Sequence, residues 1–148
     1  MTSVLPPNAI PYEPGMTLQL PMVEGKLRAG FPSPAADFAV KRCDLNELVI
    51  THPLATFFWW VAGVSMQPAI DNGDLLVVNR ALTSSVRDGD IVVAEVDGEF
   101  TVKYFRRRRS DGRVSLVAAN PTFPPIVFRE GQIMTICGKV TAVVTLFR

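Results

Sequence analysis

Cysteine and histidine are scarce in this sequence. Its 148 residues include two cysteines, Cys43 and Cys137, and a single histidine, His52. The cysteines are isolated and lack the spacing of metal ligands, and a zinc site would have almost no nitrogen donors. We therefore predict no metal site and no cofactor, and two reduced thiols of the kind that cytoplasmic proteins carry.

A long apolar run and an excess of one charge sign are also missing. The most apolar stretch, residues 57–64, is far shorter than the roughly 20 residues of a membrane-spanning helix, and residues 1–7 lack the basic start and apolar segment of a secretory signal. We therefore expect no membrane partner and a cytoplasmic location. The 15 Lys and Arg nearly balance the 14 Asp and Glu, so bulk attraction to nucleic acid is not expected.

Proline is concentrated in an N-terminal arm. Because proline removes a backbone donor and biases the preceding residue toward extended conformations, this arm cannot form a stable helical domain. No pair of amphipathic helices, and hence no helix-turn-helix, fits before Gly30. The first helix expected is Asp44–Leu48, with Asp44 as N-cap and Glu47 three residues on, as in a capping box. The prolines of the arm are Pro6, Pro7, Pro11, Pro14, Pro21, Pro32 and Pro34.

From Thr56 onward the pattern is that of one mainly-β domain, with short strands separated by turn residues. Asp97-Gly98 and Asp111-Gly112 predict type I′ hairpin turns, because such a turn needs positive φ at both central residues. Asn72-Gly73 and Asp88-Gly89 mark further turns. The strands expected are Thr56–Ala62, Leu75–Asn79, Ile91–Val96, Glu99–Arg106, Val114–Ala118 and Ile133–Val144.

Ser65 and Lys103 are the candidate catalytic pair. A serine hydroxyl is a weak nucleophile until a nearby base takes its proton. His52 precedes a proline at a helix end and is a poor candidate for that base, and the nucleophile-elbow pattern fails because position 67 is glutamine. Lys103 could serve only if burial depressed its pKa, which is about 10.4 in water. From spacing alone, a solvent-facing strand lysine is the more common case.

The residues around this pair resemble a known family. Residues 65–68, 72–78, 88–93 and 99–103 follow one another as in the LexA-type self-cleaving Ser-Lys proteases, peptidase family S24. Residues 29–37, 44–46 and 52–58 are similar to the UmuD-like members of that family, which are SOS mutagenesis proteins. The resemblance covers roughly residues 27–148. Val64 departs from the UmuD-like pattern, which has a polar residue there, but LexA-type relatives tolerate an apolar one.

The resemblance implies a mainly-β fold like the LexA and UmuD C-terminal domain, with a flexible N-terminal arm. It makes Ser65 the nucleophile and Lys103 the general base. It also makes the backbone N–H groups of Val64 and Ser65 the oxyanion donors.

The implied cleavage site is the bond between Ala29 and Gly30. Residues 1–29 would then be the arm removed by self-cleavage, residues 30–45 the remaining flexible arm, and residues 46–148 the Ser-Lys protease-fold core. The extended arm is long enough for cleavage within one subunit or across a dimer, and the sequence leaves both open.

The function implied is that of an SOS-response mutagenesis protein. A RecA-type recombinase filament on single-stranded DNA would stimulate self-cleavage by this serine peptidase. The cleaved form would be a homodimer and the accessory subunit of an error-prone, translesion Y-family (UmuC-like) DNA polymerase. The alternative is a LexA-type self-cleaving transcriptional repressor, for which the arm offers no obvious DNA-binding domain. A signal-peptidase-like enzyme, which the absent membrane anchor disfavours, and a catalytically inactive binding module are two further readings.

Three other features stand outside this assignment. The basic cluster Arg106–Arg109, with Arg113, is interpreted either as a solvated hairpin end or as a contact with DNA or an acidic partner, so direct DNA contact stays open. Residues 57–60 are aromatic and alternate between strand faces, which suggests an interface that a homodimer would cover. Residues 120–125 form an irregular loop with no assigned chemistry.

Overall fold

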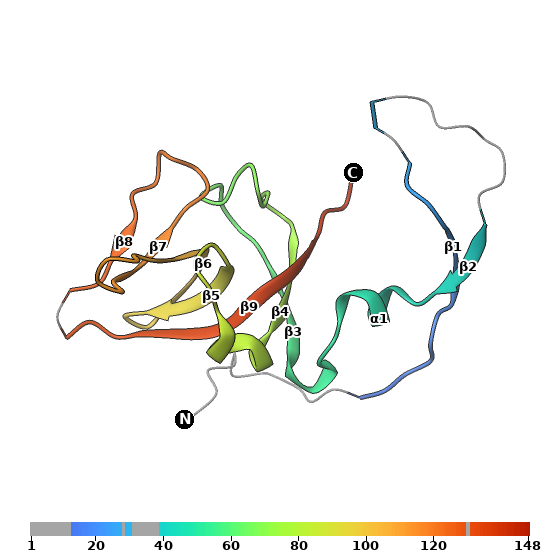
Figure 1. The fold of residues 1–148 in the computed structure, drawn as a ribbon, viewed down its shortest axis with the longest axis horizontal. Helices are drawn as coiled ribbons and strands as arrows, with labels where there is room; N and C mark the ends of the chain where they lie inside the picture. The colour runs from blue at the N-terminus through green and yellow to red at the C-terminus, as the bar shows by residue number, and fades with distance from the viewer. Residues whose placement is uncertain (1–12, 28, 31–38, 130) are drawn as a thin grey trace. The chain divides into compact units, whose positions relative to one another are not determined.

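The computed structural model describes residues 13–27, 29–30, 39–129 and 131–148 (Figure 1). The chain divides into a smaller unit, Glu13–Thr51, and a larger unit that contains His52–Arg148. The predicted division into residues 1–29, 30–45 and 46–148 is defined by the expected cleavage and not by compact units, so it stays a prediction. Within the described ranges, no helix is long and apolar enough to cross a membrane.

The smaller unit contains a two-stranded antiparallel sheet that the sequence pattern does not predict. Strand β1 (Leu20–Val23) pairs with β2 (Val40–Cys43), with Leu20 opposite Cys43. The prolines of this segment favour irregular structure, but proline is compatible with an edge strand, and both strands of a two-stranded sheet are edges. The arm is therefore partly structured, although most of its side chains in these strands are exposed.

A short helix, α1 (Leu45–Val49), follows β2 and confirms the helix expected here. Asp44 is its N-cap, as predicted, and its Oδ1 accepts a hydrogen bond of 3.0 Å from the backbone N–H of Asn46. A capping box would instead place the N-cap side chain on the N–H of Glu47. Glu47 lies in the first turn, where its negative charge faces the positive end of the helix.

The larger unit is a seven-stranded antiparallel sheet, which confirms the mainly-β class. Its order is β3-β4-β9-β5-β6-β7-β8. The strands begin and end close to the predicted limits, whereas β8 and the two 3₁₀ helices were not predicted. The elements are η1 (Pro53–Ala55), β3 (Thr56–Trp60), β4 (Leu75–Asn79), η2 (Arg80–Ser85), β5 (Ile91–Val96), β6 (Glu99–Arg107), β7 (Val114–Val117), β8 (Ile126–Val127) and β9 (Met134–Val144).

The two predicted hairpin turns have different outcomes. Asp97 and Gly98 join β5 to β6 with φ values of +50° and +82°, which confirms a two-residue turn with positive φ at both positions. At Asp111-Gly112 a hairpin turn joins β6 to β7 as predicted, and Gly112 has a φ of +71°, but Asp111 does not have positive φ, so the turn is not type I′. The loop between β6 and β7 spans residues 108–113, and it is closed by backbone bonds of 2.8 Å from Arg108 N to Arg113 O and from Gly112 N to Arg108 O.

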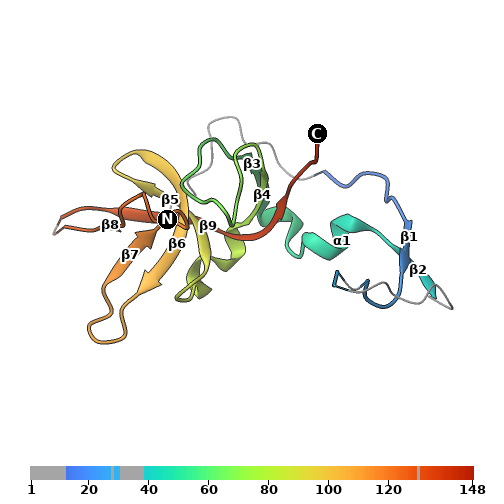
Figure 2. The same cartoon turned by 90° about the horizontal axis from the view of Figure 1, so that it is seen from above.

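Two hydrophobic clusters form the core, and they share strand β5. Successive side chains of a strand point to opposite faces, so Val93 joins one cluster with Met66 while Val92 joins the other with Phe105. Strand β9 lies between β4 and β5 in the sheet (Figure 1, Figure 2). It pairs with both, with a register shift against each partner. The shifts allow one strand to serve both parts of the sheet, because a bulge increases the local twist and bend.

Gly138 lies in β9 at the crowded point between β4 and β5. A Cβ added there would lie 2.5 Å from Val78 Cγ1 and 3.2 Å from Asn79 O. Val78 is fully buried, so it cannot move aside easily. We expect Gly138→Ala to lower the free energy of unfolding by about 1–3 kcal/mol, measured by urea denaturation. The control Gly15→Ala, with no atom within 4 Å of the new Cβ, should change it by less than about 0.5 kcal/mol. Equal effects would contradict this account.

Candidate active site

Ser65 lies in the turn that follows β3. Backbone hydrogen bonds between Val61 and residues 73–74 continue the β3–β4 pairing beyond the end of the strand. Gly63 then has a φ of +99°, which L side chains rarely adopt, and the chain turns out of the sheet. Met66 is 1% exposed and fills the first core cluster. The buried methionine thereby fixes the half-buried serine next to it.

Asn120, from the loop after β7, holds the backbone of this turn. Its N–H donates to Ser65 O at 3.0 Å, and its Nδ2 donates to Val64 O at 3.2 Å. In the described part of the chain, the N–H groups of Val64 and Ser65 donate to no protein group. No chemistry was predicted for this loop, because an Asn-Pro pair by itself indicates only a turn.

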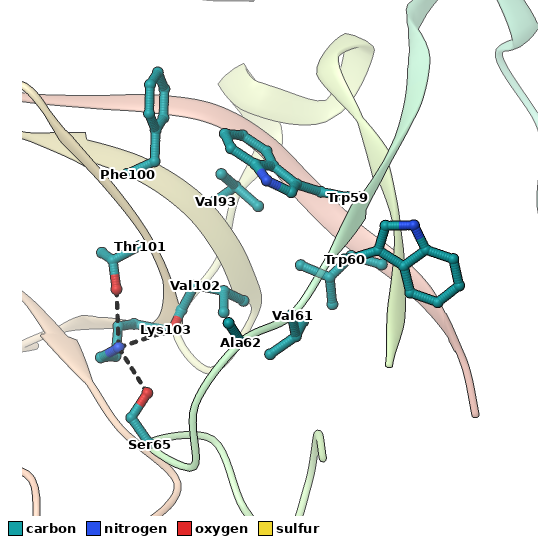
Figure 3. Close-up of a pocket in the computed structure, with 11 residues that line it drawn as sticks. Trp59, Trp60, Val61, Ala62, Ser65, Val93, Phe100, Thr101, Val102 and Lys103 are labelled. Atoms are coloured by element: carbon teal, nitrogen blue, oxygen red, sulfur yellow. Dashed lines mark hydrogen bonds between the residues drawn. The ribbon is translucent and has the colours of Figure 1, made fainter. Parts of the chain in front are cut away.

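Lys103 reaches Ser65 from strand β6 (Figure 3). It lies opposite Val92 in the sheet and is only 9% exposed. Its Nζ donates to Ser65 Oγ at 3.1 Å, to Thr101 Oγ1 at 2.8 Å and to Val102 O at 3.1 Å. The structure thus brings together the two side chains that the sequence separates by 38 positions.

The surroundings of Lys103 disfavour its charged form. None of the ion pairs among the described residues involves it: these are Arg106–Asp88, Arg108–Asp111 and Lys139–Asp90. Burial lowers the pKa of Lys103 below its ordinary value, since desolvation penalises the ammonium. A neutral amine fits the three contacts well. Two N–H bonds can donate to Thr101 and Val102, which leaves the lone pair for the hydroxyl proton of Ser65.

Thr101 is a site residue that sequence reasoning missed. It lies two positions before Lys103 on the same strand, so both side chains point to the same face, and its Oγ1 orients the amine. A threonine in a β-strand is common for reasons of propensity alone. Only the 2.8 Å distance between its Oγ1 and Lys103 Nζ distinguishes Thr101 from other strand threonines.

A partly open groove of about 260 Å³ runs from this pair along the sheet (Figure 3). Trp59 and Phe100 stand on its wall with ring centroids 5.2 Å apart, and Trp60 is largely exposed. The groove combines an apolar wall with the polar ends of Ser65, Thr101 and Lys103. Its lining residues are Trp59, Trp60, Val61, Ala62, Ser65, Leu76, Val93, Phe100, Thr101, Val102 and Lys103.

The other predicted site residues lie away from this pair or in the other unit. His52 Nδ1 is 2.8 Å from Asn79 Nδ2 at the end of β4, so the histidine has a structural partner. Ala29 and Gly30 are exposed in a bend of the smaller unit. Arg28 and residues 31–38 lie outside the described residues.

A mainly-β domain thus holds a buried lysine at hydrogen-bond distance from a serine. The sequence matches the family described as Peptidase S24-like over residues 21–141, and the chain belongs to that family. Protein SamA of Salmonella typhimurium is 44% identical over 123 residues, which cover 82% of each chain. Protein MucA of Escherichia coli is 42% identical over 124 residues, again 82% of each. The LexA repressor of Ectopseudomonas mendocina is 38% identical over 138 residues, which are 90% of this chain and 65% of that repressor. The predicted resemblance to UmuD-like members of the family is thereby confirmed.

Replacing Lys103 with methionine should stabilise the fold at neutral pH. Burial holds the pKa of Lys103 below its unfolded value, so between the two values the unfolded chain binds more protons and wild-type stability rises with pH. In a Ser65→Ala background, we expect Lys103→Met to raise the free energy of unfolding at pH 7 by about 0.5–2 kcal/mol relative to Ser65→Ala alone. The gain should shrink toward pH ~10. Urea titrations across this pH range test it, with exposed Lys41→Met as control. A gain that does not change with pH would contradict the electrostatic cause.

Proposed function

We propose that this chain is a self-cleaving serine peptidase with Ser65 as nucleophile and Lys103 as general base. One observation carries the proposal: Nζ lies 3.1 Å from Ser65 Oγ, on a buried lysine whose pKa is lowered by desolvation. A surface lysine at this spacing would be charged and could not accept a proton. A base must reach the proton that it removes and must be unprotonated when it does so.

The first chemical step joins Ser65 to the chain that is cut. Oγ attacks the carbonyl carbon of Ala29 while the hydroxyl proton passes to the neutral Nζ of Lys103. The carbonyl oxygen becomes an oxyanion, and the N–H groups of Val64 and Ser65 stabilise it. Thr101 and the carbonyl of Val102 hold the amine in line with the serine throughout.

The second step breaks the peptide bond. The tetrahedral intermediate collapses, the bond between the Ala29 carbon and the Gly30 nitrogen breaks, and the Lys103 ammonium gives its proton to the departing amine. An ester between Ser65 and Ala29 remains. A water molecule, deprotonated by the neutral lysine, then hydrolyses this ester and regenerates the serine. The products are a fragment that ends at Ala29 and a fragment that begins at Gly30.

Small residues suit this cleavage site. The substrate backbone must approach Ser65 to bonding distance, and neither alanine nor glycine carries a side chain that would prevent it. The groove beside the pair offers apolar surface for the flanking residues. Cleavage within one subunit and cleavage across a homodimer are both compatible with this chemistry.

The biological role that we propose follows the family relationship. Similarity to SamA and MucA supports an SOS-response mutagenesis protein. In this role a RecA-type filament on single-stranded DNA stimulates cleavage in the cytoplasm. The shortened homodimer then serves a Y-family, UmuC-like translesion polymerase as its accessory subunit.

Three substitutions test the catalytic pair. Ser65→Ala and Lys103→Ala should each slow self-cleavage by about 10³-fold or more, because each removes a reacting group. His52→Ala should retain the rate within about tenfold. The wild-type rate should rise about tenfold per pH unit until it levels off at the pKa of Lys103. The measurement is mass spectrometry of the intact protein over time. The expected product is a new fragment that begins at Gly30. An inactive His52→Ala beside an active Lys103→Ala, or a flat pH profile, would remove lysine from the mechanism.

Truncation tests the proposed role separately from the chemistry. Residues 30–148 carrying Ser65→Ala should restore damage-induced mutagenesis in cells that lack the native protein and contain its cognate polymerase. Full-length Ser65→Ala is the matched control and should not restore it, because its arm stays attached. The measurement is the frequency of mutants after DNA damage. If the truncated chain folds but does not restore mutagenesis, the accessory-subunit role is contradicted, while the peptidase assignment is unaffected.

A further inference from the structure

The strongest concentration of charge in the molecule lies on the hairpin of β6 and β7. We call Arg106, Arg107, Arg108, Arg109 and Arg113 the arginine hairpin, and all five side chains are exposed. Asp88 and Asp111 are the acidic side chains that contact it. These seven residues carry a net charge of +3 in a chain whose total is +1, so the rest of the sequence carries −2. The positive potential is therefore local, although the chain is nearly neutral.

The arginine hairpin borders a hollow of about 350 Å³. Arg106, Arg107, Arg108 and Arg113 line it, with Pro125 and Val127 on its apolar side. In Figure 2 the loop that joins β6 to β7 projects beyond the ends of these strands. A charged ligand could therefore reach these guanidinium groups without entering the groove beside Ser65.

Only part of this positive charge is neutralised within the protein. Arg106 lies 3.9 Å from Asp88, and Arg108 lies 3.4 Å from Asp111. Across the residues that the structure describes, Arg107, Arg109 and Arg113 form no ion pair. Arg107 also stacks over the ring of Phe105, with 5.3 Å between Cζ and the centroid. That contact restricts the side chain before any ligand binds, which reduces the entropy lost on binding.

We propose that the arginine hairpin binds the phosphate backbone of a nucleic acid. The planar guanidinium presents paired donors that match a phosphate, and every basic residue of the cluster is arginine rather than lysine. None of the residues that line the hollow is aromatic, so they do not form the aromatic platform on which successive bases of a single strand stack. Binding is therefore independent of sequence and similar for single and double strands. This site is separate from the Ser65–Lys103 pair and does not depend on the proposed cleavage.

Two other uses of the cluster fit the structure less well. A hairpin end that only prevents aggregation needs charge, but lysine serves that purpose equally and no hollow is required. An acidic peptide that adds a strand to the sheet would have to pair with the edge strand β8, which is two residues long. A phosphate backbone needs no strand pairing and presents its charges to side chains alone.

Fluorescence anisotropy of labelled DNA tests the proposal on the full-length protein. The probes are single- and double-stranded oligonucleotides of roughly 20 nucleotides at about 50 mM salt. Arg107→Gln/Arg109→Gln/Arg113→Gln should raise Kd at least about tenfold for both probes. It should also reduce the slope of log K against log salt by about 2 on the single strand, since three phosphate contacts are lost. The loop pair Arg109→Gln/Arg113→Gln, which leaves the strands untouched, should give a smaller loss in the same direction.

The control variant removes three arginines elsewhere in the larger unit. Arg87, Arg129 and Arg148 are also exposed, and their replacement by glutamine should leave Kd within about twofold. Equal losses in the two triple variants would overturn the proposal, because bulk charge would then explain binding. It would also be overturned if the wild-type chain failed to bind DNA at low salt. Displacement of DNA by polyglutamate at equal or lower concentration than by unlabelled DNA would assign the surface to an acidic peptide instead.

Discussion

The rest of the site depends on one interaction: the buried Lys103 faces Ser65, and no carboxylate in the described part of the chain forms an ion pair with it. An ammonium in this position loses much of its hydration, and neither Thr101 nor Val102 supplies a compensating negative charge. A nearby carboxylate would stabilise the fold, but it would also hold the proton on Lys103 and remove the base. On the proposed mechanism, the absence of a counterion among the described residues is therefore a requirement of the chemistry, and the surrounding sheet must stabilise the fold despite it.

The fold places the two side chains on different elements: Lys103 on a strand and Ser65 on a turn. Lys103 lies on β6, where it pairs with Val92 of β5, and the pairing of β6 with β7 begins at the next residue, Tyr104. Ser65 lies in a turn, but Met66 anchors that turn in the core and Asn120 holds its carbonyl groups. A strand and an anchored turn fix the separation of Oγ and Nζ more closely than two free loops would.

Local sequence rules account for much of the fold, and they fail at identifiable places. The Asp97-Gly98 turn follows from its two residues, because few sequences tolerate positive φ twice in succession. The geometry at Asp111-Gly112 does not follow from the pair, because only Gly112 has positive φ and local backbone bonds close a longer loop over residues 108–113. The strands β1 and β2 were not predicted because the prolines of the arm argue against strands. Proline, however, disfavours only the interior strands of a sheet, and β1 and β2 are both edge strands. For the site, the motif order indicates Ser65 and Lys103, whereas Thr101 and Asn120 are recognised only by their distances.

On the proposed mechanism, substrate binding and activation of the base are linked. The groove beside Ser65 is partly open, so Lys103 is shielded incompletely before the cleavage segment docks. A peptide laid over the pair excludes further water, and this strengthens the desolvation that already lowers the pKa of the lysine. The docked segment thus helps to create the base that cuts it. A filament that merely favours the docked arrangement would then accelerate cleavage at neutral pH by shifting a population, without any contact with Ser65 or Lys103.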